Sequence, residues 1–266
     1  MIDPKISIGI PTCNQSDFIL QCVNSALNIE YKNLEVIVSD DSSDEKTNTI
    51  LKPYIEQKKI KYYRNKPALG RVQNYQKILY EYSTSEWHMN LDGDDYYIHK
   101  DFLNEALKYL LDTPDLMFIQ FNHTKNIVDA PTVNPKIMEF SATEYLSYFC
   151  RTHYFSHLGL LYNRKLAIAN NFYSYNILST DIKSVLKLVL TTKGKTIVTS
   201  EIIGLWRQHD KNTSNKSSDG LIVKNYLSFL TLLCENFSIR NLYNIGFRFV
   251  LYTLFYHFIL KRIKIK

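Results

Sequence analysis

Short apolar runs and amphipathic stretches alternate along the first hundred residues of the chain. Residues 5–10 (KISIGI) and 34–39 (LEVIVS) are rich in β-branched side chains and have the length of buried strands. Residues 18–28, between them, carry apolar side chains three to four positions apart, which predicts a helix. The alternation continues with predicted helices over 45–57 and 71–82 and predicted strands over 59–64 and 87–91. A strand and a helix about every 30 residues are typical of βαβ units in a parallel sheet.

The pattern is less regular after residue 100. The predicted helices cover 100–112, 141–150, 180–190, 221–236 and 241–261, and the predicted strands cover 116–121, 157–162 and one or two segments within 197–207. Residues 122–139 are expected to form a long loop. Ser141 and Glu144 have the spacing of a capping box at the start of their helix.

Composition narrows the class of protein without naming a partner. Of the 266 residues, 45% are hydrophobic and 22% are charged, which indicates a globular chain. The net charge of +6 is compatible with nucleic acid, anionic lipid or phosphate-bearing substrates. The four cysteines form no C-x-x-C pair, so zinc and redox motifs are not expected. The first residues predict no signal peptide, and no apolar run predicts a membrane-spanning helix.

Polar residues follow three of the predicted strands at the point where each strand ends. They are Pro11-Thr12-Cys13-Asn14, Asp40-Asp41-Ser42 and Asp92-Gly93-Asp94-Asp95. Ligands of open α/β sheets bind at the carboxyl ends of the strands, and the topology brings these ends to one edge. We therefore expect the three segments to form one site.

Three carboxylates within four residues, in LDGDDYY, suit a hard divalent cation such as Mg²⁺ or Mn²⁺. The alternative is a solvated acidic turn at a strand end. An EF-hand does not fit, because its D-x-D-x-D-G spacing and terminal Glu are missing. A haloacid-dehalogenase-type phosphatase does not fit either, because Tyr96 stands where that motif has Thr or Val.

With these pieces taken together, the chain resembles a family 2 glycosyltransferase of the inverting, bacterial surface-polysaccharide type. The matching pieces, in order over about residues 5–215, are IPTCN, VSDDSSD, Gly70 to Asn74, LDGDDYY and WRQHDKNTS. The resemblance implies an α/β fold of the GT-A type, with a Rossmann-like, mostly parallel central sheet flanked by helices. Residues 1–215 would be the catalytic domain, and residues 216–266 a C-terminal helical extension outside the resemblance.

The resemblance also implies roles for individual residues. The nucleotide-sugar would be bound by Pro11, Thr12, Asn14, Asp41, Gly70, Arg71, Asn74, Asp92, Asp95 and Arg207. Asp94 and His209 would bind Mn²⁺ or Mg²⁺, which bridges the diphosphate. The residues alone allow a simpler interpretation of each position. Asp41 is equally compatible with a turn or capping residue, and His209 with a surface histidine. Asn74 is equally compatible with a polar residue on the exposed side of its helix.

Asp181 is the candidate catalytic base. Family members carry Glu-Asp at the start of this helix, and here the pair is Thr180-Asp181, so the first acid is missing. An aspartate in the first helical turn is also favoured by the helix dipole without any catalysis. A carboxylate base with a single displacement implies inversion at the anomeric carbon.

The function implied is transfer of a sugar from a nucleotide-diphosphate donor, UDP-sugar favoured, to a hydroxyl of a glycan or lipid-linked acceptor. The product would belong to O-antigen, capsule, lipopolysaccharide or a similar polysaccharide. One alternative is a non-catalytic nucleotide-sugar or glycan-binding protein, which the missing acid favours. A nucleotidyltransferase is a second alternative, although PTCNQSD has no glycine for its phosphate loop. No motif indicates nucleic-acid binding.

The last 46 residues, 221–266, are dense in aromatic side chains and end in Lys261, Arg262, Lys264 and Lys266. Aromatic residues followed by a basic end predict peripheral membrane contact through the C-terminal helix. We therefore expect a cytoplasmic protein at the inner face of the bacterial plasma membrane. The alternative is a helix that packs on the catalytic domain or on a partner subunit.

Overall fold

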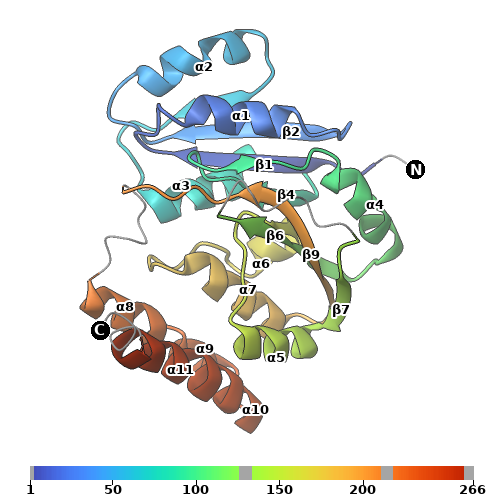
Figure 1. Ribbon diagram of the computed structural model, residues 1–266, viewed down its shortest axis with the longest axis vertical. Helices are drawn as coiled ribbons and strands as arrows, with labels where there is room; N and C mark the ends of the chain where they lie inside the picture. The colour runs from blue at the N-terminus through green and yellow to red at the C-terminus, as the bar shows by residue number, and fades with distance from the viewer. Residues whose placement is uncertain (1–2, 126–133, 211–217, 261–266) are drawn as a thin grey trace.

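Four parallel strands make the first half of the central sheet, and helices follow the first three (Figure 1). This computed structural model describes residues 3–125, 134–210 and 218–260. The strands are β1 (Ile6–Thr12), β2 (Leu34–Asp40), β3 (Lys61–Arg64) and β4 (Trp87–Asn90). The helices are α1 (Ile19–Leu27), α2 (Lys46–Glu56) and α3 (Arg71–Lys77), the last continued by the π-helical turn η1 (Ile78–Tyr82).

The second half of the sheet is mixed. The strand order is β3-β2-β1-β4-β8-β6-β9-β5, and β7 pairs with β9 beside this path. The additional strands are β5 (Tyr96–Tyr97), β6 (Leu116–Thr124), β7 (Ile137–Ser141), β8 (Leu160–Asn163) and β9 (Lys195–Leu205). Strand β8 runs antiparallel to both β4 and β6, whereas β6 and β9 are parallel. The predicted α/β sheet flanked by helices is confirmed, with parallel strands concentrated in its first half.

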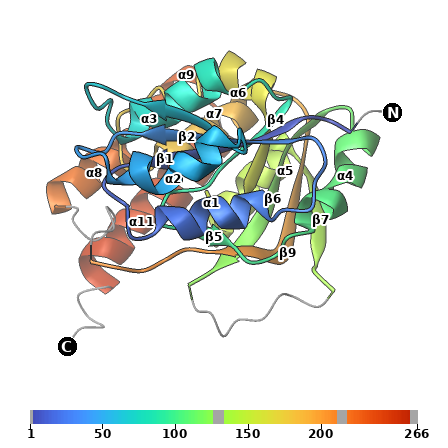
Figure 2. The ribbon, with the colours of Figure 1, turned by 90° about the horizontal axis from the view of Figure 1, so that it is seen from above.

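Helices cover both faces of the sheet and divide the core into two clusters. Helices α1, α2 and α4 (Phe102–Asp112) pack on one face, where alternate residues of β1, Ile6, Ile8 and Ile10, are fully buried (Figure 2). Helices α3, α5 (Ala142–Thr152), α6 (Arg164–Ala169) and α7 (Thr180–Thr191) pack on the other (Figure 1). The alternation of side chains along a strand accounts for this two-sided core.

The predicted elements up to residue 112 are present, with ends displaced by one or two residues. The capping box is also confirmed: the Ser141 side chain accepts from the Glu144 N–H, and Glu144 accepts from the Ser141 N–H. The predicted loop over 122–139 is wrong in part, because β6 extends to Thr124 and β7 begins at Ile137. Strand β7 lies exposed on one face, so its sequence lacks a buried apolar run. Residues 126–133 of that loop lie outside the described residues.

Two short elements were not predicted. Strand β5 has only two residues, and it is defined by pairing with Leu205 and Gly204 of β9 rather than by its own pattern. Helix α6 is six residues long and begins where the Asn163 side chain accepts from the Leu166 N–H. Neither element is long enough to show a periodicity in the sequence.

The single helix predicted over 221–236 is wrong. The segment forms α8 (Asp219–Leu227) and α9 (Leu230–Glu235), with a break at Ser228. The Ser228 carbonyl accepts from the Thr231 N–H at 3.3 Å, three residues on instead of four, and from Nζ of the buried Lys183 of α7 at 2.7 Å. A tertiary contact therefore accompanies the break between α8 and α9, and the local sequence pattern does not predict it.

A last helical stretch runs from Ile239 to Leu260 through α10 (Ile239–Asn241), η3 (Leu242–Leu251), α11 (Tyr252–Phe255) and η4 (Tyr256–Leu260). It packs along α5, where the rings of Phe149 and Phe249 lie 5.2 Å apart. Ile245, Phe249 and Val250 are buried in the core cluster that contains α5 and α7. Among the described residues, no helix has both the length and the apolar content needed to cross a membrane.

Candidate active site

The carboxyl ends of β1, β2 and β4 open into one cleft of about 1190 Å³. The cleft is lined by every predicted site residue except Arg207, namely Pro11, Thr12, Asn14, Asp41, Gly70, Arg71, Asn74, Asp92, Asp94, Asp95, Asp181 and His209. The topology therefore brings residues from positions 11 to 209 together at one edge of the sheet. Their roles in binding and catalysis stay predictions.

Asp41 is buried at the end of β2 and is held from two sides. Its Oδ2 accepts from the Gly70 N–H at 2.8 Å, and its Oδ1 accepts from the Asn65 side-chain amide at 2.8 Å. Gly70 has a φ of 84°, a left-handed conformation that favours glycine and turns its N–H toward the carboxylate. Each carboxylate oxygen keeps a second lone pair, so Asp41 can still accept from a ligand.

Asn74 does not lie on an exposed helix face, as the alternative reading proposed. It is 2% exposed, and its side-chain amide donates to the Ser39 carbonyl at 3.0 Å. Its Oδ1 in turn accepts from Asn65 at 3.4 Å. Asn74 thus connects α3 to the end of β2 while it lines the cleft.

Asn14 joins the ends of β1 and β2. Its N–H donates to the Ser42 hydroxyl at 2.8 Å, and its Oδ1 accepts from the Ser43 N–H at 3.0 Å. Asn14 has a φ of 55°, which an asparagine tolerates better than most residues. The VSDDSSD segment is therefore fixed by the segment that follows β1.

The loop after β4 lies tightly against the segment after β1. A Cβ on Gly93 would come within 2.6 Å of Gln15 Oε1 and 2.8 Å of Thr12 Oγ1, so no side chain fits there. Asp92 accepts a short hydrogen bond from the Tyr75 hydroxyl. Asp94 and Asp95 instead contact the segment that follows β9. The glycine in the Asp-x-Asp motif allows the close approach.

Arg207 and His209 hold the acidic loop from the segment after β9. Arg207 donates its backbone N–H to Asp95 Oδ1 at 2.9 Å and its Nε to the Asp94 carbonyl at 2.7 Å. Its Nη2 reaches Gln21 at 2.6 Å, and its guanidinium lies over the Phe18 ring. The guanidinium therefore supports the loop from behind, which is why Arg207 does not line the cleft. Residues 211–214 of WRQHDKNTS lie outside the described residues.

His209 contacts Asp94 directly, and both residues line the cleft. Its Nε2 lies 2.8 Å from Asp94 Oδ2, and its ring stacks on Phe18 with centroids 4.9 Å apart. Stacking fixes the imidazole plane, and Asp94 itself is only 8% exposed. One nitrogen and one carboxylate oxygen thus meet at a position where both can bind the same ion.

Burial and mutual repulsion disfavour ionisation of the acidic residues in this loop. Burial raises the pKa of Asp95 to about 9, and the neighbouring Asp92 and Asp94 add to the rise. Burial likewise raises the pKa of Asp92 above its ordinary value. Ionisation of these carboxyls becomes favourable when a positive charge enters the cleft.

The donor set fits a divalent cation. Asp94 and His209 supply an oxygen and a nitrogen 2.8 Å apart, and a positive charge there would offset the burial that raises the pKa values of Asp92 and Asp95. Mg²⁺ and Mn²⁺ use few protein carboxylates when substrate phosphates complete the coordination. Two protein ligands beside an open cleft meet that requirement.

Asp181 lies in the first turn of α7 and lines the cleft, whereas Thr180 is fully buried. Arg71 Nη2 donates to the carbonyls of Ile177 and Leu178 at 2.9 and 2.8 Å, just before this helix. Arg71 therefore connects α3 to the segment that carries Asp181.

The sequence did not single out the opposite wall of the cleft. It is formed by residues of α8, α11, η4 and the segment after α5, namely His153, Phe155, His157, Ile222, Asn225, Tyr226, Thr253, Tyr256 and His257. Asn225 accepts from the Ser179 N–H at 2.9 Å and donates to the Ser179 hydroxyl at 3.1 Å, so α8 also fixes the start of α7. The aromatic density of residues 221–266 was the available signal, but it does not indicate which side chains face inward.

Comparison with known proteins agrees with this geometry. Residues 7–169 match the family model described as Glycosyl transferase family 2. This chain is 28% identical over 109 residues to the GalNAc(5)-diNAcBac-PP-undecaprenol beta-1,3-glucosyltransferase of Campylobacter jejuni, covering 41% of this chain and 34% of that protein. It is 33% identical over 113 residues to an uncharacterized glycosyltransferase of Haemophilus influenzae, covering 41% and 43%. The chain thus spans less than half the length of these relatives.

Solved structures share the fold at low sequence identity. S. aureus TarS in complex with UDP-GlcNAc superposes with a TM-score of 0.75 at 16% identity, covering 96% of this chain and 73% of that chain. The Pyrobaculum calidifontis mannosyltransferase PcManGT, in complex with GDP-Man and Mn²⁺, superposes with a TM-score of 0.69 at 14% identity, covering 97% and 71%. The structural likeness therefore extends into residues 216–266, beyond the sequence motifs.

The fold and the cleft define a GT-A type α/β protein with a site at the carboxyl ends of its strands. The chain belongs to glycosyl transferase family 2, and the predicted family is confirmed.

Proposed function

We propose that the protein transfers a sugar from a UDP-sugar, with a divalent cation, to a hydroxyl of a lipid-linked glycan acceptor, with inversion at the anomeric carbon. The observation that carries the proposal is the single cleft lined by Asp41, Asp94, Asp181 and His209, in which His209 Nε2 lies 2.8 Å from Asp94 Oδ2. TarS bound to UDP-GlcNAc and PcManGT bound to GDP-Man and Mn²⁺ support a nucleotide-sugar donor and a metal.

The nucleotide side of the cleft has a donor and acceptor pattern suited to a nucleoside diphosphate. Asp41, fixed by Gly70 and Asn65, accepts from the N–H of the base. Pro11, Thr12 and Asn14 line the same end, and Asp92, held by Tyr75, faces the ribose or the sugar. A divalent cation held by Asp94 and His209 supplies positive charge for the diphosphate leaving group.

Asp181 supplies the base. An acceptor hydroxyl has a pKa far above 7, so its proton must leave as the new bond to the anomeric carbon forms. The Asp181 carboxylate takes that proton while the bond from the anomeric carbon to the diphosphate oxygen breaks. Attack from the face opposite the leaving group inverts the configuration, and UDP departs with the electron pair.

The wall formed by α8 and η4 receives the acceptor. Tyr226, Tyr256 and His257 line it and offer ring faces and hydrogen-bonding groups to a sugar. The similarity to the Campylobacter jejuni protein, whose name includes a PP-undecaprenol acceptor, supports a lipid-linked glycan. Synthesis of O-antigen, capsule or a similar polysaccharide is the setting that this acceptor class implies.

Membrane contact through the last helical stretch is part of the proposal. Its polar Asn244 and Thr253 face the protein, 3.4 Å from Ser147 and His153. Its outer face exposes aromatic and aliphatic side chains, namely Tyr243, Phe247, Leu251, Tyr252 and Phe255. An aromatic face beside a basic chain end suits an anionic lipid surface. The basic residues 261–266 lie outside the described residues.

Product analysis tests the function against its alternatives. The protein is incubated with Mn²⁺, candidate UDP-sugars and a polyprenyl-diphosphate-linked saccharide, and the released phosphates are separated by chromatography. The proposal predicts UDP and a glycan one sugar longer with the opposite anomeric configuration. In a parallel incubation with nucleoside triphosphates and sugar 1-phosphates, release of pyrophosphate would instead identify a nucleotidyltransferase. Nucleotide-sugar binding without UDP release would identify a binding protein.

A further inference from the structure

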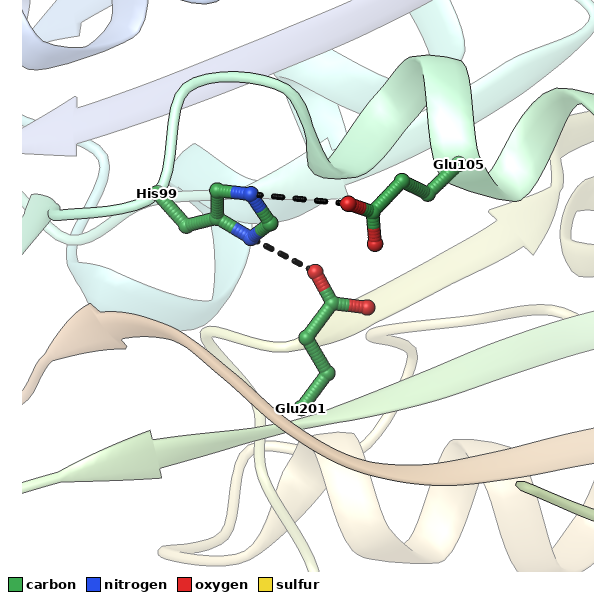
Figure 3. Close-up of side chains that lie close together, drawn as sticks. All are labelled: His99, Glu105 and Glu201. Atoms are coloured by element: carbon green, nitrogen blue, oxygen red, sulfur yellow. Dashed lines mark ion pairs between the residues drawn. The ribbon is translucent and has the colours of Figure 1, made fainter. Parts of the chain in front are cut away.

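A histidine and two glutamates from three elements meet outside the cleft (Figure 3). His99 follows β5, Glu105 lies on α4, and Glu201 lies in β9. His99 Nδ1 lies 2.6 Å from Glu201 Oε1, and His99 Nε2 lies 3.7 Å from Glu105 Oε1. One ligand atom from each residue lies within 4.8 Å of the other two.

Glu201 is a buried acid that lies beside other carboxyls. Its side chain is 8% exposed, and the titratable groups that face it include the carboxyls of Glu105 and Asp101 as well as His99. Burial, with Glu105 adding to it, raises the pKa of Glu201 to about 8. Lys108 lines the adjoining cavity, but its Nζ lies 4.7 Å from the centre of the Tyr109 ring. A positive charge added here would therefore favour the ionised carboxylate.

His99 Nδ1 and Glu201 Oε1 are close without forming a hydrogen bond. Both atoms are buried, and neither has a hydrogen-bond partner among the described residues, because the imidazole N–H is not directed at the oxygen. Two buried lone-pair atoms 2.6 Å apart repel each other unless a proton or a metal ion lies between or beside them, and the zinc measurement below distinguishes the two. The pair therefore points to a missing ligand of positive charge.

The cluster opens to a cavity of about 450 Å³. Glu105 and Glu201 line it, together with Asn104 and Thr199. The Glu105 side chain is 49% exposed, so it can rotate toward the other two ligands at little cost. The cavity gives an ion and its water a path to the buried carboxylate.

We propose that His99, Glu105 and Glu201 bind one Zn²⁺ ion, with water from the cavity as a further ligand. Imidazole nitrogen and carboxylate oxygen are common zinc ligands, and Zn–ligand lengths of about 2.1 Å place neighbouring ligand atoms roughly 3–3.5 Å apart. One ion binds only one imidazole nitrogen: Nδ1 lies 2.6 Å from Glu201 Oε1, and the exposed Glu105, which lies 3.7 Å from the other nitrogen, rotates to reach the same ion.

The ion connects two segments that carry residues of the cleft. His99 comes four residues after Asp95, and Glu201 comes six residues before Arg207. Both segments already pair through β5 and β9, where the N–H groups of Ile98 and His99 donate to the Ile203 carbonyl at 2.9 and 3.3 Å. Zinc at this site fixes the acidic loop relative to the segment that holds it, without contact to substrate.

Zinc binding is measured in the Asp94→Asn background, so that the proposed catalytic metal site does not contribute. The protein is equilibrated with ZnSO₄, dialysed and analysed for zinc. We expect one ion per chain and a rise in melting temperature, since a ligand of the native state stabilises it. Glu105→Gln and Glu201→Gln, each in that background, should lose the ion. Glu56→Gln, an exposed glutamate of α2, is the matched control and should keep it.

Glu105→Gln separates loss of zinc from a folding defect. The Glu105 side chain is half exposed, so the variant in EDTA should melt at the same temperature as the background protein. Absence of bound zinc in the background protein, or its retention after both substitutions, would overturn the proposal. The cluster would then hold only a proton between its carboxylates. Neither result bears on sugar transfer, which the product analysis tests separately.

Discussion

The carboxylates of the cleft differ in how their charge is balanced. Asp41 receives two hydrogen bonds from neutral donors, whereas Asp94 has His209, and Asp92 and Asp95 have raised pKa values. Asp181 stands apart from them at the start of α7. Separation of a metal-binding group from a base is what the proposed chemistry needs, because the base must stay free to take a proton.

At the residue scale, Asp181→Asn should remove the base and keep the fold. We expect transfer to fall by about 10²-fold or more, the range typical of a lost general base, while UDP affinity stays unchanged. Turnover is measured by UDP release and affinity by calorimetry, with Asp112→Asn at the exposed end of α4 as the matched control. Near-normal turnover in Asp181→Asn would remove Asp181 as the base.

The motif residues could be predicted from the sequence because the chemistry fixes their types and spacing. Asp94 and His209 belong to motifs that resemble the family, and the structure places them 2.8 Å apart. The supporting role of Arg207 was not predicted, since its contact to the Asp94 carbonyl depends on how β9 is placed beside β5. Contacts between distant backbone groups leave no pattern in the local sequence.

At the element scale, the parallel strands are joined by a buried carboxylate. Glu35 of β2 is paired with Lys5 and with Lys61 of β3, both at 2.8 Å, and accepts from the Thr84 N–H at 2.8 Å. Burial raises the pKa of this group, but the hydrogen bonds from Lys5 and Lys61 outweigh it and lower the pKa to about 2. These contacts hold β1, β2 and β3 in the register that aligns their carboxyl ends.

Glu35→Gln should therefore destabilise the fold. Loss of the hydrogen bonds from the partly exposed Lys5 and Lys61 to the buried carboxylate costs about 1–2 kcal/mol of the free energy of unfolding at pH 7. Because the folded pKa lies below the ordinary value of 4.5, the wild-type advantage is present above pH 4.5 and is lost as the pH falls toward 2. Urea unfolding at pH 7 and pH 3 measures both effects, with Glu56→Gln as control. Equal stability of Glu35→Gln and wild type at pH 7 would contradict this account.

Long elements were predictable and short ones were not. Strands β1 and β2 have the apolar runs that burial on both faces requires, whereas β5, α6 and the break after α8 depend on tertiary contacts. The same limit applies to the far wall of the cleft, where the sequence showed an aromatic segment but not the inward position of Tyr226 or Tyr256.

At the scale of the whole molecule, the last helical stretch (residues 239–260) has one face buried in the core and one face exposed. One face buries Ile245 and Phe249 in the core, so removing everything after Ile239 would expose that core. The other face presents Tyr243 and Phe247, which are 52% and 55% exposed. Point substitutions on the outer face therefore test membrane contact without damage to the fold.

Tyr243→Ser with Phe247→Ser should weaken sedimentation with anionic vesicles, because less apolar surface enters the lipid interface. We expect a loss of at least about tenfold in the partition coefficient, and little binding of either protein to neutral vesicles. Leu111→Ser, an exposed apolar residue of α4, is the control. Undiminished binding of the double variant would show that this face does not contact lipid.

The most direct test of the central claim is the melting temperature of the protein with a panel of nucleoside diphosphates, with and without Mn²⁺. A ligand that binds only the native state raises the melting temperature. The account predicts a rise with UDP that requires Mn²⁺, that is lost in Asp94→Asn and that is kept in Asp112→Asn. A metal-independent rise, or the same rise in Asp94→Asn, would contradict the assignment of the acidic loop to a metal that holds the diphosphate.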